Sequence, residues 1–300
     1  MSDIQPLLRR YYQYLKLERN CSSNTLDAYQ RDLTRFLEYC TLHSISPLSP
    51  TLSDFHQFSS TLIDLGIHST SLSRILSGVR SFYHYLLLSG EIDDDPTELL
   101  EFPERGKHLP DVLSVEEVDK IESVIDLSSA EGTRNKAMIE TLFSCGLRVS
   151  ELCNLKMSDL YLDEGFIRVF GKGKKDRLVP ISEKAIHLLR LYFTDRNQIP
   201  IKPGNEDFVF ISKLRKTKLS RIMVFHFIKE LVEKAGIKKA VSPHTFRHSF
   251  ATALLEGGAN LRAIQTMLGH EGIGTTEIYL HIDTSHLRQE LLTHHPRYNK

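Results

Sequence analysis

Apolar residues in the first part of the chain recur every three or four residues, the interval that places side chains on one face of a helix. These stripes predict helices over residues 4–15, 26–40, 53–65 and 72–87. Ser22 or Ser23 can cap the second helix, because a serine hydroxyl accepts a hydrogen bond from a free amide of the first turn. Gly66 and Gly90 follow the third and fourth helices, where a left-handed residue is least strained as glycine. We therefore expect a four-helix domain here.

The stretch over residues 91–110 breaks this pattern. It holds the run Asp93–Asp95, then Pro96, Pro103 and Pro110, with little periodicity. Proline and charge without an apolar stripe are typical of a linker between domains. A chain of 300 residues also exceeds the usual size of a single core, so two domains are expected. The expected division is a helical domain with its linker over residues 1–105 and a second domain over 106–300.

Residues beyond the linker predict further helices and one hairpin. Two β-rich runs, 166–170 and 177–181, flank the basic turn 171–176. The run 208–211, Phe-Val-Phe-Ile, is expected to add a third strand. Helical stripes follow over residues 223–235, 245–256 and 261–268. The expected fold class is therefore mainly α with a small antiparallel sheet.

Charge is balanced over the whole chain but unevenly distributed. Lys and Arg number 38 and Asp and Glu also 38, yet residues 1–105 hold 9 of the former and 14 of the latter. The remainder holds 29 against 24, an excess of 5 positive charges. Net charge alone does not indicate a nucleic-acid partner, so composition leaves the function open.

No segment of the sequence resembles a membrane span or a secretory signal. Apolar runs fall short of the roughly 18 residues that a spanning helix needs, and residues 1–10 lack the apolar core of a signal peptide. Cys21, Cys40, Cys145 and Cys153 form no CxxC pair and stand in apolar helical patterns. Free buried thiols favour a reducing compartment, so we expect a cytoplasmic protein.

The first segment with candidate chemistry is Gly146-Leu147-Arg148-Val149-Ser150-Glu151-Leu152. Gly146 is expected to end one helix and Arg148 to lie in the first turn of the next, where backbone amides and a guanidinium suit a phosphate. The alternative is a surface ion pair between Arg148 and Glu151, which are three residues apart in that helix. Both interpretations fit the segment by itself.

The second segment is the basic turn Gly171-Lys172-Gly173-Lys174-Lys175. It lacks the glycine spacing and the Ser or Thr of a nucleotide-binding P-loop, so ATP use is not indicated. Lys172 stands between two glycines and could approach a bound backbone closely. A solvated run of charge is the alternative, and for Lys174 and Lys175 it is preferred, together with nonspecific phosphate contact.

The third segment is His244-Thr245-Phe246-Arg247-His248. Phe246 belongs to a buried stripe, whereas His244, Arg247 and His248 are expected together on the remaining surface of the helix. Two histidines four residues apart could bind zinc, but no acidic residue completes such a motif. No metal site is therefore expected here.

The fourth segment is Leu268-Gly269-His270, with Tyr279 nine residues after the histidine. A tyrosine hydroxyl titrates near pH ~10 and needs help to act as a nucleophile. Arg148 and Arg247 could clamp the oxygens of a phosphodiester in its transition state, and Lys172 could protonate the leaving oxygen. Taken together, the four segments fit phosphodiester transfer with no metal ion and no nucleotide cofactor.

This combination of motifs resembles the tyrosine recombinase (integrase) family. The motifs that carry the resemblance are GLRVSEL, GKGKKDRLVP, HTFRHSFAT, LGHEGIGTTEIY and HHPR near the C-terminus, and the likeness extends over nearly the whole chain. Within the family the chain is most similar to the Xer subfamily, on its XerD branch. Position by position, the resemblance implies a catalytic set of Arg148, Lys172, His244, Arg247, His270 and the nucleophile Tyr279.

The resemblance also implies a two-domain clamp around double-stranded DNA, with a four-helix SAM-like domain and an α+β catalytic domain. Such an enzyme would form a 3′-phosphotyrosyl intermediate and exchange strands through a Holliday junction at a dif-like site, which resolves chromosome or plasmid dimers. Its partners would be other recombinase protomers, copies of itself or a second Xer protein, in a synaptic tetramer, and a DNA translocase of the FtsK type. No cofactor and no membrane are implied.

Two alternatives remain for the function. One is another enzyme of the same chemistry, such as a mobile-element integrase or a type IB topoisomerase. The other is a non-catalytic DNA-binding protein on this fold, which is disfavoured because all of the catalytic residues are present. To bind DNA, the acidic N-terminal domain needs a local basic face, and Arg74 and Arg80 on the polar side of the fourth helix are the candidates.

The last 21 residues predict one more short helix. Thr284 or Ser285 can cap it, and its apolar face includes Leu287, Leu291 and Leu292. A helix this short is stable only when its apolar face is docked. Docking on its own domain is one interpretation. The resemblance favours docking on a neighbouring protomer, which would couple the position of the nucleophile to assembly.

Overall fold

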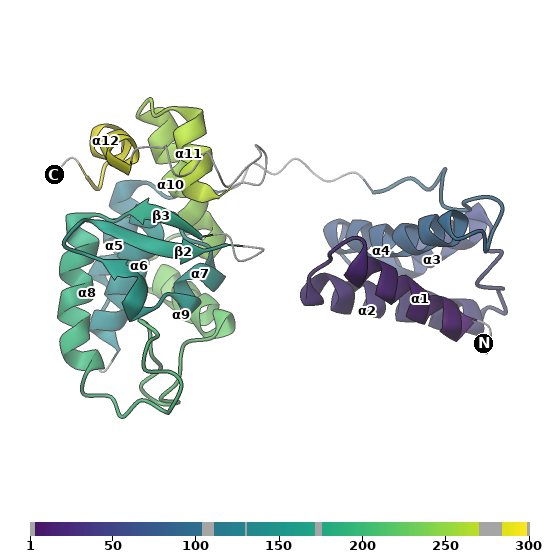
Figure 1. Cartoon of the computed structure of the whole chain (residues 1–300), viewed down its shortest axis with the longest axis horizontal. Coiled ribbons are helices and arrows are strands. Elements are labelled where there is room, and N and C mark those ends of the chain that lie inside the picture. Colours follow the sequence, from purple (N-terminus) through teal and green to yellow (C-terminus); the bar gives the residue numbers. More distant parts are fainter. Residues whose placement is uncertain (1–3, 104–110, 130, 172–175, 270–283, 299–300) are drawn as a thin grey trace. The chain divides into compact units, whose positions relative to one another are not determined.

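The computed structural model describes residues 4–103, 111–129, 131–171, 176–269 and 284–298 (Figure 1). The chain divides into two compact units, Met1–His108 and Leu109–Lys300. Within the described residues, no helix is both long and apolar enough to cross a membrane.

The first unit contains the helices that its apolar stripes predict. They are α1 (Ile4–Leu17), α2 (Ser23–Leu42), α3 (Leu52–Asp64) and α4 (Ser69–Leu88). Ser22 caps α2 by accepting a hydrogen bond from the amide of Thr25, and Gly66 and Gly90 have φ of 80° and 70° after α3 and α4. The stripes meet in one core, to which each helix contributes, as by Tyr11, Phe36, Phe58 and Phe82. The four predicted helices are confirmed.

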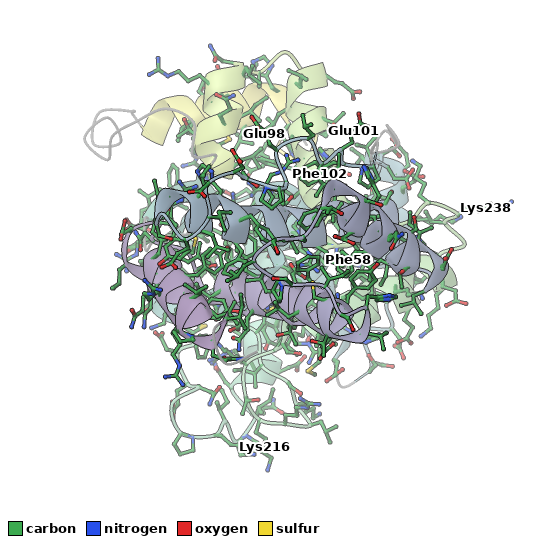
Figure 2. The ribbon with its side chains drawn as sticks, turned by 90° about the vertical axis from the view of Figure 1, so that its right-hand side faces the viewer. Phe58, Glu98, Glu101, Phe102, Lys216 and Lys238 are labelled. Carbon is green, nitrogen blue, oxygen red and sulfur yellow. The ribbon has the colours of Figure 1, made fainter. Side chains whose placement is uncertain are left out.

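Arg80 has a structural role in this unit, and its part in a DNA-binding face stays a prediction. Its guanidinium donates hydrogen bonds to the carbonyl oxygens of Thr97 and Leu100 and lies 4.3 Å from the ring centre of Phe102, which Figure 2 labels. The side chain therefore holds the segment after α4 against the helix. Arg74 forms an ion pair with the buried carboxylate of Asp32 but keeps 47% of its side chain exposed, so it remains a candidate.

The second unit is mainly helical around a small sheet. Its elements are α5 (Val115–Ser123), α6 (Gly132–Cys145), α7 (Val149–Asn154), the 3-10 turn η1 (Met157–Asp159), β1 (Leu160–Tyr161), β2 (Phe166–Phe170), β3 (Asp176–Pro180), α8 (Glu183–Arg196), α9 (Arg221–Lys234), α10 (Pro243–Glu256), α11 (Leu261–Leu268) and α12 (Thr284–His294). The strands pair antiparallel in the order β1-β2-β3, with Ile167 opposite Val179. Both side chains are buried in a core that α6 and α8 share. The predicted fold class is confirmed.

The run 208–211 does not join this sheet, contrary to the prediction. It makes isolated bridges, Phe208 with Lys156 and Ile211 with Lys218. The amide of Val209 donates to the carbonyl of Leu155, so the run finds its hydrogen bonds in surrounding loops. Its β-rich composition reflects burial of its side chains in the core of the unit. The third strand is β1, whose two residues are too few to show a pattern.

The C-terminal helix α12 packs on its own domain. Leu287 and Leu291 are buried with Phe250 of α10 and Met267 of α11. Beyond the helix, Tyr298 donates a hydrogen bond to the carbonyl of Pro180 at 3.0 Å. In the single chain the structure shows the intramolecular alternative, because the apolar face of α12 finds a complementary surface on α10 and α11. Docking of this helix on a neighbouring protomer stays a prediction.

A buried charged cluster lies beneath this C-terminal segment. Glu122 and Glu140 are 3% and 0% exposed. Lys184 Nζ lies 2.6 Å from Glu122 Oε2 and 3.1 Å from Glu140 Oε2. Arg297 contacts Glu140 at 3.3 Å and Asp119 at 2.6 Å. Burial, followed by the charge of Glu140, raises the pKa of Glu122 to about 7.

This raised pKa predicts a pH dependence of stability. Above pH 4.5 the unfolded chain loses the Glu122 proton, whereas the folded chain keeps it until about pH 7. The contribution of Glu122 to the free energy of unfolding therefore falls as the pH rises through this window. Glu122→Gln removes the titrating carboxyl group. The free energy of unfolding of this variant, relative to that of the unmodified chain, should therefore increase from pH 5 to pH 8. Urea unfolding at each pH measures the difference.

The control is Glu233→Gln, since this residue is an exposed carboxylate on α9. Its stability difference from the unmodified chain should stay constant over the same pH range. A constant difference for Glu122→Gln as well would show that Glu122 is ionised throughout, held by Lys184.

Candidate active site

The connection between α6 and α7 places Arg148. Gly146 follows α6 with φ 58°, and a Cβ atom there would lie 2.4 Å from the ring of Phe250. Only glycine fits this turn, because it needs both the left-handed backbone and the missing side chain. Leu147 is buried, and Arg148 is the N-cap residue of α7. The predicted break between two helices is confirmed. Arg148 lies one residue before the first turn of α7, whereas the prediction placed it within that turn.

Glu151 joins Arg148 to a second arginine, Arg177 of β3. Its Oε1 accepts hydrogen bonds from Arg148 Nη1 and Arg177 Nη1, both at 2.9 Å, and its Oε2 accepts one from Arg177 Nη2 at 3.0 Å. Burial raises the pKa of Glu151, but the hydrogen bond and charge of Arg177 and the hydrogen bonds of Arg148 outweigh burial and hold this pKa below its usual value. The predicted Arg148–Glu151 ion pair exists, and its carboxylate is buried.

Arg247 of α10 reaches the same place from another helix. Its guanidinium donates hydrogen bonds to the carbonyl of Gly146 at 2.7 Å and to that of Leu268 at 2.5 Å. Arg148 Nη2 donates to the next carbonyl, that of Gly269, at 3.2 Å. The structure therefore brings Arg148 and Arg247 together at the C-terminal end of α11.

The electrostatics of this place favour an anion. Burial and the positive charge of Arg148, and also that of Arg177, lower the pKa of Arg247 to about 10, so Arg247 stays charged near neutral pH. Arg148, Arg177 and Arg247 bring three positive charges to this place, and the carboxylate of Glu151 pairs with the first two. Arg148 keeps 35% of its side chain exposed, so a ligand from solvent can reach it. A phosphate is the ligand that such paired guanidinium forks bind well.

The remaining predicted site residues divide into two groups. His244 lies in the first turn of α10 and is exposed, as is His248, whereas Arg247 between them is buried. The prediction that all three share one exposed surface is therefore wrong for Arg247. Among the residues that the structure describes, no three His, Cys, Asp or Glu side chains gather as a metal site requires.

Lys172, His270 and Tyr279 lie outside the described residues. Their neighbours in the sequence are described. β2 ends at Phe170 and β3 begins at Asp176, so Lys172 belongs to the connection between paired strands. His270 directly follows Gly269, whose carbonyl accepts from Arg148.

Two residues of the site were missed in the sequence. Glu151 was considered only as a surface partner of Arg148. The available signal was its position three residues after Arg148, from which a glutamate can accept a hydrogen bond from the N-cap amide. Arg177 offered no local signal, because its partners are 26 and 90 residues away.

Known proteins share sequence similarity with both units. Residues 111–286 match the phage integrase family, and residues 8–90 match the phage integrase N-terminal SAM-like domain. The chain is 41% identical over 290 residues to tyrosine recombinase XerD of Oceanobacillus iheyensis, covering 96% of this chain and 97% of that protein. It is 40% identical over 301 residues to tyrosine recombinase XerD of Staphylococcus aureus, covering 98% and 100%.

Solved structures show the same fold. The XerH site-specific recombinase bound to difH substrate, in a pre-cleavage complex, matches with a TM-score of 0.67 at 25% identity, over 94% of this chain and 83% of that one. The Tn1549 transposon integrase in complex with circular intermediate DNA matches with a TM-score of 0.73 at 22% identity, over 95% and 98%.

Proposed function

The chain belongs to the phage integrase family and is a tyrosine recombinase of the Xer type, and we propose that it resolves chromosome or plasmid dimers at a dif-like site. In this proposal it cuts one DNA strand with Tyr279 and exchanges strands through a Holliday junction. The observation that supports the chemistry best is the meeting of Arg148 and Arg247 at the end of α11, next in sequence to His270.

The proposed reaction uses these residues in distinct roles. The hydroxyl oxygen of Tyr279 attacks the phosphorus and gives up its proton to water, forming a 3′-phosphotyrosyl bond. The bond from phosphorus to the 5′-oxygen breaks, and Lys172 supplies the proton that this oxygen takes. Arg148 and Arg247 stabilise the charge that gathers on the two non-bridging oxygens.

His244 and His270 complete the proposed catalytic set. His244 is at the first turn of α10, the helix that carries Arg247. The two arginines supply permanent positive charge at the phosphate, so the proposed step uses no metal ion and no nucleotide cofactor.

A nicked duplex that carries a candidate dif-like site tests this function. Cleavage of such a substrate loses the short leaving strand, which traps the covalent adduct as a band that resists SDS. We expect the full amount of adduct in excess EDTA. Loss of the band on chelation, with recovery on adding zinc or magnesium, would show that the arginines do not suffice.

Two relatives support a DNA partner for this chain. The XerH and Tn1549 structures are complexes with their own DNA substrates. By analogy we propose that this chain binds double-stranded DNA as a tetramer of recombinase protomers, in the cytoplasm and with an FtsK-type translocase. A plasmid with two dif-like sites separates this function from that of a mobile-element integrase, because only the former recombines them.

A basic loop between α8 and α9 is the surface we propose for further phosphate contacts. Its tip is closed by a hydrogen bond from the amide of Lys202 to the carbonyl of Lys216, which Figure 2 labels at the lower end of the molecule. At its base, Lys218 donates to Asn154 at the end of α7, about 9 Å along this helix from Arg148. Five cations of the loop are exposed, namely Lys202, Lys213, Arg215, Lys216 and the Lys218 already described.

Replacing Lys213, Arg215 and Lys216 together by Gln is expected to weaken DNA binding and its dependence on salt. Each lost phosphate contact reduces the magnitude of the slope of log K against log salt concentration by about 0.9. The slope of the triple variant should therefore be smaller in magnitude by up to ~2.7. Fluorescence anisotropy of labelled duplex at several salt concentrations measures this slope.

The matched control removes the same charge from exposed lysines elsewhere in this unit, namely Lys120, Lys229 and Lys238. It should keep the original slope. Equal slopes for both triple variants would exclude the loop as a phosphate contact.

A further inference from the structure

The side chain of Arg177 donates hydrogen bonds to two helices outside the sheet to which Arg177 belongs. It stands in β3 with 7% of its side chain exposed. Nη1 and Nη2 donate to the two carboxylate oxygens of Glu151 at 2.9 and 3.0 Å. Nε donates to the carbonyl of Met267, in the last turn of α11, at 2.7 Å. One planar group thus holds α7 and α11 at once.

The turn after α11 is fitted to the same guanidinium. Gly269 has φ 64°, and a Cβ atom there would lie 3.1 Å from Arg177 Nη1. The chain therefore passes directly over Arg177 just before it reaches His270. Arg177 also directly follows Asp176, the first residue of β3 after the turn that carries Lys172.

We propose that Arg177 is a positioning residue, which sets the spacing between α7, β3 and α11 and so holds Arg148 in place for the reaction. The inference rests on the function proposed above. Arg177 itself is much less accessible to a ligand than Arg148, with 7% of its side chain exposed against 35%, and its guanidinium donates to Glu151 and Met267. It acts through these partners, since Glu151 in turn fixes the backbone and guanidinium of Arg148.

The shape of the guanidinium explains why this residue is arginine. Its donors point in fixed directions in one plane. Three acceptor atoms, two on Glu151 and one on Met267, are therefore held in a defined geometry. A lysine would keep the charge but offer donors from a single nitrogen on a flexible stem. It could satisfy Glu151 or Met267, but it would not fix the distance between them.

Arg177→Lys is therefore expected to slow strand cleavage while DNA affinity stays close to that of the unmodified chain. A displacement of about 1 Å at a reacting group can cost on the order of 100-fold in rate, and a loss of this size is expected. The measurements are the single-turnover rate of adduct formation on the nicked duplex and the Kd for the same duplex.

The control is Arg168→Lys in the neighbouring strand. Arg168 also holds a buried carboxylate, that of Asp159, with Nε 2.8 Å and Nη2 2.7 Å from Oδ1, but it makes no contact with Glu151 or α11. Thermal melting of both variants shows how far each weakens the fold. Arg168→Lys should cleave at nearly the original rate at a temperature where both variants are folded.

A double-mutant cycle provides a second readout that loss of stability alone would not give. If Arg177 acts through Arg148, then Arg177→Lys should cost much less in cleavage rate when Arg148→Lys is already present. Additive losses would contradict this coupling.

The remaining outcomes are equally decisive. Cleavage by Arg177→Lys at the original rate would overturn the inference, as would equal slowing by Arg177→Lys and Arg168→Lys. A raised Kd with an unchanged cleavage rate would make Arg177 a binding contact instead. If the unmodified chain forms no adduct, the proposed function fails, and this failure is distinct from that of Arg177.

Discussion

Tyr279→Phe is expected to abolish the covalent DNA adduct while leaving DNA binding unchanged. The substitution removes one oxygen atom, and that oxygen is the proposed nucleophile, so the phosphotyrosyl bond has no atom from which to form. The nicked duplex with the candidate site, followed by denaturing electrophoresis, measures adduct formation. Band shifts with intact duplex measure binding in parallel.

Tyr161→Phe is the control for this experiment, because Tyr161 is a partly exposed tyrosine of the same unit, in β1. It should form the adduct as the unmodified chain does. An adduct that persists in Tyr279→Phe would show that another residue attacks the phosphate. The assignment of the nucleophile would then be wrong even if recombination occurs.

Arg297→Leu is expected to lower the free energy of unfolding of the second unit by about 3–5 kcal/mol. The substitution leaves Glu140, which is fully buried, and the nearby Asp119 without one of their cations. A buried charge that loses its partner keeps the whole cost of leaving water, and Lys184 alone then faces two buried carboxylates. Urea unfolding of the full chain, monitored by tyrosine fluorescence, measures the change.

Arg190→Leu provides the comparison. Arg190 and Asp163 form an ion pair with side chains that are 58% and 90% exposed, and such pairs contribute about 1 kcal/mol or less. Equal destabilisation by the two substitutions would mean that the Arg297 cluster is solvated and does not fasten the C-terminal segment. A large loss only for Arg297→Leu would also imply that truncation after Asp283 weakens the second unit itself.

The sequence by itself determined the parts of this protein that depend on neighbouring residues. The stripes of α1 to α4, the Ser22 cap and the glycine after α6 are local features, since periodicity and backbone preference need no distant partner. The helices α9, α10 and α11 follow for the same reason, within two residues at each end. The motifs also led to the tyrosine recombinase family, to which the chain belongs.

Only the tertiary structure decided how these parts meet. Arg80 looked like a surface cation, but carbonyls 17 and 20 residues away use its guanidinium. The apolar face of α12 required a partner surface, and the fold supplied it on α10 and α11. Arg177 joins Glu151 and Met267 because three distant segments fold to one place, and no local pattern records such a meeting. The helices depend on contacts between residues close in sequence, whereas the site depends on contacts between residues distant in sequence.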